Sequence, residues 1–259
     1  MSASLVDVNV NLSRWPFRRL PQDEPSRLVS KLREHNVRQA WTGSFDAILH
    51  RDLAGSNARL ARDCHEFGHG ILVPFGTINP MFPDWEEDLR RCDEHHHMAG
   101  IRLYPNYHGY KLDEPIFARL LHAASQRGLI VQLAVIMEDS RTQHPLVQVP
   151  AVDLAPLPSL ANQIEKLRLT LLNSFQPLNL ELISRLAATG KVYFDIATLE
   201  GVGGIENLLK QIPLKLLLFG SNAPLFYFES SALKLIESAL PAEEKRFITG
   251  ENARRLMAK

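Results

Sequence analysis

The residues best suited to acid–base chemistry are two histidines and two glutamates in polar stretches that follow apolar segments. Histidine titrates near neutral pH, so His144 and His108 are the leading candidates for a general acid or base. Glu200 and Glu138 are the candidate carboxylate partners. Each of these residues taken alone is more often a surface side chain or a cap than a catalytic group, and that alternative stays open.

Asparagine is concentrated where apolar segments end. The chain has 12 asparagines, and six of them close or follow such a segment, namely Asn9, Asn11, Asn79, Asn106, Asn173 and Asn222. Turn formation explains part of this pattern, above all beside the prolines that adjoin Asn79 and Asn106. The asparagines that end apolar segments instead predict a hydrogen-bonding pocket, because each buried amide without a partner costs ~1–3 kcal/mol. Either the amides pair with one another and with water, or a ligand supplies the partners, and we expect a polar ligand.

Other polar residues near the same segment ends extend this candidate ligand-binding site. They are Arg14, Asp46, Arg102, Tyr104, Gln132 and Arg141. An arginine at such a rim would clamp a carboxylate or a phosphate. A solvated rim position or a structural salt bridge is the alternative for each arginine. Together with the asparagines, these residues predict a small polar or anionic metabolite as the partner.

A site of this kind needs a scaffold that brings the segment ends together. The chain contains eight strand-like segments, at residues 4–10, 37–44, 70–78, 99–105, 129–135, 167–173, 191–197 and 214–220. Amphipathic helical patterns lie between them. Eight strand–helix units in ~250 residues indicate a (β/α)8 barrel, whose active sites lie at the carboxyl ends of the strands. We predict an α/β protein with a single TIM-barrel domain over residues 1–259, a C-terminal helical tail, and a lid at residues 137–158.

Several segments resemble the amidohydrolase-related TIM-barrel family, which includes metal-dependent hydrolases and aminocarboxymuconate-semialdehyde decarboxylase-like enzymes. VDVNVN at 6–11 is similar to the family's D-x-H-x-H opening, and residues 100–133 resemble its fourth and fifth strand units. LLLFGSNAPLFYFES at 216–230 resembles the strand-eight signature, and EKRFITGENARRLM at 244–257 resembles the C-terminal helix. The resemblance spans nearly the whole chain and implies the same barrel.

The resemblance also implies a divalent metal, usually zinc, yet every ligand position is altered. The family's histidines and aspartate correspond to Asn9, Asn11, Gln132 or Ala134, Asn173 and Asn222. A neutral amide offers zinc neither the charge nor the softness of imidazole, thiolate or carboxylate. We therefore predict no metal ligands and no cofactor at that place. The alternative is a divalent metal such as zinc at a non-standard site built from Glu138, His144 and Glu200.

Composition excludes other classes of partner. The chain has 29 basic and 29 acidic residues, which gives no electrostatic reason to bind nucleic acid. No apolar run approaches the ~20 residues of a membrane span, and we predict no membrane partner. Two cysteines without a disulfide framework favour a reducing compartment, so we expect a cytoplasmic protein. Self-association into a homo-oligomer stays open.

Taken together, the sequence predicts a small-molecule hydrolase of the amidohydrolase-related superfamily with a degenerate, metal-free, asparagine-lined site at the strand ends. One alternative is a non-catalytic pseudoenzyme that only binds a ligand. Another is a metal-dependent hydrolase or carboxy-lyase with relocated ligands. Whether catalysis survives is undecided, and the expected chemistry is hydrolysis or carbon–carbon bond cleavage in a small polar metabolite.

Overall fold

The computed structural model describes residues 5–176 and 179–258, and its single sheet has eight parallel strands in the order β1 to β8. The strands are β1 (Leu5–Leu12), β2 (Val37–Ser44), β3 (Leu72–Thr77), β4 (Gly100–Leu103), β5 (Ile130–Ala134), β6 (Leu169–Leu172), β7 (Val192–Asp195) and β8 (Leu217–Leu218). Each strand pairs with the next one along the chain. All eight carboxyl ends therefore meet on one side of the sheet, as a (β/α)8 barrel requires.

The sheet curves until its first strand meets the segment that follows its last. The Val8 amide donates to the Phe219 carbonyl over 2.9 Å, and the Asn11 amide donates to the Ala223 carbonyl over 2.8 Å. These two bonds join β1 to the residues after β8, which itself contains only two residues. The predicted barrel is therefore confirmed, although residues 214–216 of the eighth predicted strand form a 3-10 turn.

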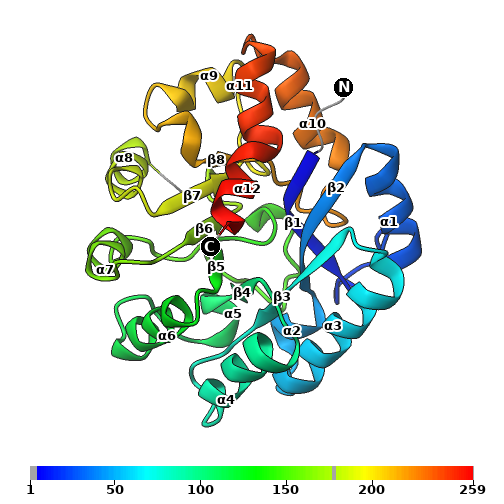
Figure 1. Ribbon diagram of the computed structural model, residues 1–259, viewed down its shortest axis with the longest axis vertical. Helices are drawn as coiled ribbons and strands as arrows, with labels where there is room; N and C mark the ends of the chain where they lie inside the picture. Colours follow the sequence, from blue (N-terminus) through cyan, green and yellow to red (C-terminus); the bar gives the residue numbers. More distant parts are fainter. Residues whose placement is uncertain (1–4, 177–178, 259) are drawn as a thin grey trace.

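Helices surround the strands, as Figure 1 shows. They are α1 (Pro25–Glu34), α2 (Asp46–Leu49), α3 (Leu53–Gly68), α4 (Trp85–Arg90), α5 (Pro105–His108), α6 (Pro115–Gln126), α7 (Leu157–Gln163), α8 (Leu180–Ala188), α9 (Gly204–Leu209), α10 (Phe228–Glu237), α11 (Ala242–Arg246) and α12 (Asn252–Met257). Shorter 3-10 or π turns span Arg91–His95, Ser140–Thr142, Leu214–Leu216 and Phe247–Glu251. The longer helices follow the predicted amphipathic patterns, whereas α7 and α9 are too short to show a clear period.

Local sequence explains where the longer helices start and stop. Pro25 and Pro115 stand in the first turns of α1 and α6, where a missing amide hydrogen costs nothing. The chain leaves α6 and α8 through Gly128 and Gly190, both at φ 68°, a conformation that glycine adopts without steric cost. These signals place β5 and β7 directly after a helix.

The C-terminal tail closes the amino-terminal side of the barrel. Ala253 and Leu256 of α12 share one buried apolar cluster with Val6, Trp41 and Phe75, at the amino-terminal end of the barrel. In Figure 1, α12 (red) lies in front of the ring of strands. With this side sealed by apolar side chains, polar groups are left to gather at the opposite, carboxyl-terminal end.

Candidate functional site at the barrel mouth

One half of the polar cluster at the mouth is centred on Asn9 of β1. Its Nδ2 donates to Asn173 Oδ1 over 2.9 Å and to Asp195 Oδ2 over 2.7 Å. The backbone amide of Asn173 donates to the other carboxylate oxygen of Asp195 over 3.0 Å, and Asn173 Nδ2 donates to the Ile136 carbonyl. The ends of β1, β6 and β7 are thus tied together by groups that satisfy one another.

The other half joins Asn11 to Asn222 and to Arg102. Asn11 Nδ2 donates to Asn222 Oδ1 over 3.2 Å, while Asn11 Oδ1 accepts from Arg102 Nη1 over 2.7 Å. Asn173 and Asn222 both have φ 56°, in the left-handed region that asparagine tolerates better than most residues. Backbone conformation therefore contributes to the choice of asparagine at these two positions. The side-chain NH2 groups of all four asparagines already donate to protein oxygens. Direct contact of these asparagines with a ligand stays a prediction.

Arg102 of β4 is the central cation of the cluster and is only 1% exposed. Besides Asn11, it donates to Gln132 Oε1 over 2.8 Å and to the carbonyls of Val10 (2.9 Å) and Trp41 (3.0 Å). Gln132 in turn donates to the Val8 carbonyl over 2.7 Å. The predicted ligand-binding residues Arg102 and Gln132 are therefore brought together with the asparagines, although most of their donors are already used.

Two buried aspartates, Asp7 of β1 and Asp195 at the end of β7, complete the cluster. Asp7 Oδ1 accepts from the backbone amides of Asn9 and Ser221, and Asp7 Oδ2 accepts from Ser221 Oγ over 2.5 Å. Burial raises the pKa of Asp7 to about 7 and that of Asp195 to about 6. In the sequence, Asp7 stands at the aspartate of the segment that resembles the D-x-H-x-H opening, and Asp195 lies in an apolar strand segment, but neither signal distinguishes a buried carboxylate from an exposed one.

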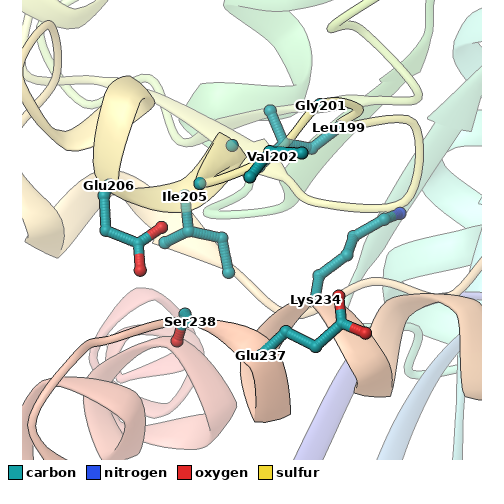
Figure 2. A pocket seen from close by; sticks show the side chains of 10 residues that line it. Leu199, Gly201, Val202, Ile205, Glu206, Lys234, Glu237 and Ser238 are labelled. Atoms are coloured by element: carbon teal, nitrogen blue, oxygen red, sulfur yellow. The ribbon is translucent and has the colours of Figure 1, made fainter.

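A lysine supports Asp195 from outside the barrel. Lys234 Nζ donates to the carbonyls of Ile196 (3.0 Å) and Ala197 (2.7 Å), directly after β7. Figure 2 shows this side chain reaching from α10 toward the loop after β7, with Glu237 beside it, in a cavity of about 410 Å³. Burial lowers the pKa of Lys234, whereas the charge of Asp195 acts to raise it. Because its ammonium serves backbone carbonyls, Lys234 is a supporting residue of the strand ends.

An apolar cap covers the mouth. It consists of Trp15, Leu20, Phe45, Ile48, Tyr104, Ala134, Met137 and Leu225, with Phe17, Tyr107 and Phe226 packed at its edge. Trp15 packs edge-on against Phe45, with ring centroids 5.2 Å apart. Met137 is the first residue of the predicted lid, so this segment contributes to the cap. These apolar side chains lie over the strand ends that carry the polar cluster.

Three polar atoms within or beside the cap have no hydrogen-bond partner. They are Trp15 Nε1, Tyr104 Oη and His108 Nδ1. Tyr104 and His108 meet edge to face with ring centroids 6.0 Å apart. Burial raises the pKa of Tyr104 and lowers that of His108, so both side chains are neutral at pH 7. A bound ligand or water is one way to satisfy such atoms.

A second place of interest is a cavity of about 480 Å³ at the rim, lined in part by Glu138, Arg141 and Glu200. Glu138 accepts from Arg18 Nη1 over 2.7 Å and Glu200 accepts from Gln176 over 2.6 Å. Arg141 forks onto Asp139, whose pKa it lowers to about 2. Three of the predicted residues therefore share this rim cavity, yet each of them already has a polar partner.

The remaining predicted residues belong neither to the polar cluster at the strand ends nor to the lining of the rim cavity. His144 is exposed and stacks on Phe17 with ring centroids 5.7 Å apart. Arg14 pairs with Glu24 over 2.7 Å at the surface, and Asp46 lies 3.5 Å from Arg59. Asn79 Oδ1 accepts from the Met81 amide, which is the turn role expected beside a proline. A catalytic or ligand-binding role for these residues stays a prediction.

The comparisons with known proteins agree with this architecture. The amidohydrolase family model matches residues 16–258. The chain belongs to the amidohydrolase family. A comparison with curated proteins gives no match. Among solved structures, the chain is similar to 5-carboxyvanillate decarboxylase from Sphingomonas paucimobilis, with a TM-score of 0.78, 10% identity and 99% of each chain covered.

Two further crystal structures share the fold. One is 2,6-dihydroxybenzoate decarboxylase from Rhizobium, with a TM-score of 0.71, 11% identity and 98% of each chain covered. The other is a 5-carboxyvanillate decarboxylase from Novosphingobium aromaticivorans with bound manganese and 3-methoxy-4-hydroxy-5-nitrobenzoic acid. Its TM-score is 0.73 at 13% identity, with 99% of this chain and 97% of that chain covered. At such identities the likeness establishes the fold alone.

The manganese in that relative raises the question of whether the mouth of this chain suits a metal. Within residues 5–176 and 179–258, no group of three or more His, Cys, Asp or Glu side chains is placed to hold an ion. Asn11 Oδ1 accepts from a guanidinium and Asn173 Oδ1 accepts from another amide. Zinc is held by imidazole, thiolate or carboxylate, which these amides do not provide, and amide oxygens that already accept a hydrogen bond are not free to bind manganese.

Among the residues that the structure describes, no helix is long and apolar enough to cross a lipid bilayer.

Proposed function

We propose that this amidohydrolase binds a small anionic metabolite beneath the apolar cap and hydrolyses it with His108 as general base. The observation that carries the proposal is the set of three partnerless polar atoms at the cap, Trp15 Nε1, Tyr104 Oη and His108 Nδ1. Each such atom costs ~1–3 kcal/mol when buried without a partner, so a ligand that pairs with them gains affinity.

The tautomer of His108 suits a base. Its Nε2 lies 3.0 Å from the Ala47 carbonyl, which only accepts hydrogen bonds, so Nε2 carries the proton of the neutral ring. Nδ1 therefore keeps a free lone pair. Because burial lowers the pKa of His108, the ring stays neutral at pH 7 and ready to take a proton from water.

The other two atoms suit a developing negative charge. Trp15 Nε1 donates only, and Tyr104 Oη donates when the phenol is neutral. The Arg102 guanidinium is the polar group beside Tyr104 Oη, and its charge and its loose hydrogen bond to that oxygen both oppose the rise of the Tyr104 pKa caused by burial, so the phenol proton is left free to be donated. A cationic neighbour and two donors favour a carboxylate or an oxyanion. The aromatic rings of the cap provide flat apolar walls for the rest of the ligand.

These groups support a balanced hydrolytic step. A water oxygen bonds to the carbonyl carbon of an ester or amide as its proton passes to His108 Nδ1. The carbonyl oxygen becomes an oxyanion that accepts hydrogen bonds from Tyr104 and Trp15. The bond to the leaving group then breaks, and the imidazolium of His108 returns the proton to that group.

The related decarboxylases suggest which compounds to try. One was crystallised with 2,6-dihydroxybenzoate and another with a methoxy-hydroxy-nitrobenzoic acid. We infer that small aromatic carboxylates, and esters or amides that carry a carboxylate, are the first candidates for this chain. Their flat ring suits the aromatic cap, and their anionic group suits the donors beside Arg102.

The decisive experiment compares His108→Gln with wild type on a panel of such esters, amides and free acids. Glutamine keeps a donor for the Ala47 carbonyl but provides no base, so we expect retained stability and binding with a 10²–10⁴-fold loss of kcat. His122→Gln, at an exposed position of α6, is the matched control.

Each other outcome has a definite meaning. Unchanged turnover in His108→Gln would reject this residue as the base. Binding without turnover by wild type would replace the hydrolase proposal with the non-catalytic alternative. Release of carbon dioxide from a free acid would assign a carboxy-lyase instead.

A further inference from the structure

The cation at the barrel mouth is built into the chain. We propose that the Arg102 guanidinium is the resident cation of the barrel mouth and holds the strand ends together without a divalent metal. Four of its five N–H groups donate to two side-chain oxygens and two backbone carbonyls, which come from β1, β2 and β5. A manganese ion is present in the crystal structure of one relative.

The acceptors match a guanidinium better than a metal. Asn11 Oδ1, Gln132 Oε1 and the carbonyls of Val10 and Trp41 are all neutral oxygens. A guanidinium presents its donors in a plane at fixed directions and stays charged in proteins, so it satisfies several carbonyl-type oxygens at once. A divalent ion at the same place would lack the carboxylate, imidazole or thiolate ligands that it needs.

Two nearby carboxyl groups favour a cation there. Asp7 and Asp195 are both buried in the cluster, and their charges act to raise the pKa of Arg102 against the effect of burial. With Arg102 in position, the mouth contains its own positive charge. A second, divalent cation beside it would be repelled.

The chain also makes room for this side chain. Gly43 of β2 has no side chain where the guanidinium passes, and a Cβ there would lie 2.8 Å from both Arg102 Cδ and Nη1. Glycine weakens a strand, so its presence inside one marks a close approach by another group. The absence of a side chain at Gly43 therefore leaves the niche that the Arg102 guanidinium fills.

The first test measures thermal unfolding of the wild-type protein, after chelation and again with saturating Mn²⁺ or Zn²⁺. We expect the two Tm values to agree within ~1 °C. An ion that binds the folded state at 100 times its Kd raises the Tm of a chain this long by ~5 °C or more, which would overturn the proposal. So would one equivalent of metal that copurifies with the chain and is lost together with several degrees of Tm.

The second test uses Gly43→Ala, with Gly204→Ala as the matched control. At Gly204 the nearest atom to an added Cβ is 3.4 Å away, an ordinary contact. We expect Gly43→Ala to lower Tm by several degrees because it displaces the guanidinium, and Gly204→Ala to leave it nearly unchanged. Equal Tm values for the two variants would contradict the niche.

A third variant, Arg102→Met, removes the cation and exposes four oxygen acceptors. We expect it to lower Tm by several degrees and saturating Mn²⁺ to restore none of that loss, because four neutral oxygens provide no carboxylate, imidazole or thiolate ligand for the ion. Recovery of Tm in Mn²⁺ by this variant would show that the place suits a metal and would overturn the proposal. If Arg102→Met does not fold, the metal titration of the wild-type protein still tests the proposal.

Discussion

Replacing Asp7 by asparagine is expected to stabilise the protein at pH 8, although Asp7 is fully buried and makes three hydrogen bonds. Two of these bonds come from backbone amides to Oδ1, which an asparagine carbonyl accepts equally well. The third joins Oδ2 to Ser221 Oγ, and a hydroxyl can rotate to accept from the new amide. The substitution therefore removes a buried charge and preserves its hydrogen bonds.

The magnitude follows from the pKa of Asp7, which burial raises from 3.8 to about 7. Because the folded state holds this proton more tightly than the unfolded state, the stabilisation is fully present below pH 3.8 and is lost as pH rises through about 7. A shift of about 3 units corresponds to ~4 kcal/mol in total. About two of these units lie above pH 5, so wild type should lose ~3 kcal/mol relative to Asp7→Asn between pH 5 and pH 8.

Urea unfolding of both proteins at pH 5 and pH 8 measures this difference directly. The free energy of unfolding of Asp7→Asn should exceed that of wild type at pH 8, and the gap should narrow at pH 5. A variant that is less stable than wild type at both values, or a gap independent of pH, would refute the argument. Either result would mean that the carboxylate is stabilised in the fold as an anion.

Three further predictions concern the same barrel. Asp195→Asn should destabilise the protein by ~1–3 kcal/mol in the same urea assay. Both carboxylate oxygens of Asp195 accept hydrogen bonds from amides, one from Asn9 Nδ2 and one from the backbone of Asn173. In the variant, one of these donors would face the new NH2 group and lose its acceptor. Trp15→Phe should leave stability within ~1 kcal/mol, since it removes a buried donor without a partner, while calorimetric titration should show weaker binding of an anionic ligand. Leu256→Ala should cost ~2–5 kcal/mol by thermal or urea unfolding, because Leu256 is buried where α12 seals the lower barrel.

The eight strand–helix units and their order can be predicted from the amino-acid sequence alone. Strand segments, helix starts such as Pro25 and Pro115, and helix ends such as Gly128 and Gly190 are read from a few neighbouring residues. Local spacing and turn chemistry are enough for this purpose, and a barrel follows from the number of units. The carboxyl-end position of the polar residues follows from the same topology.

Which polar residues are free to meet a ligand depends on the tertiary structure and cannot be predicted from the sequence. His108 and His144 look alike in the sequence, yet one is bonded to the Ala47 carbonyl beneath the cap and the other is exposed. Arg102 was expected to clamp a ligand, whereas most of its donors are used by β1, β2 and β5. These outcomes depend on contacts between residues 61 to 91 positions apart, where burial and pairing are set by how distant strands pack and not by local pattern.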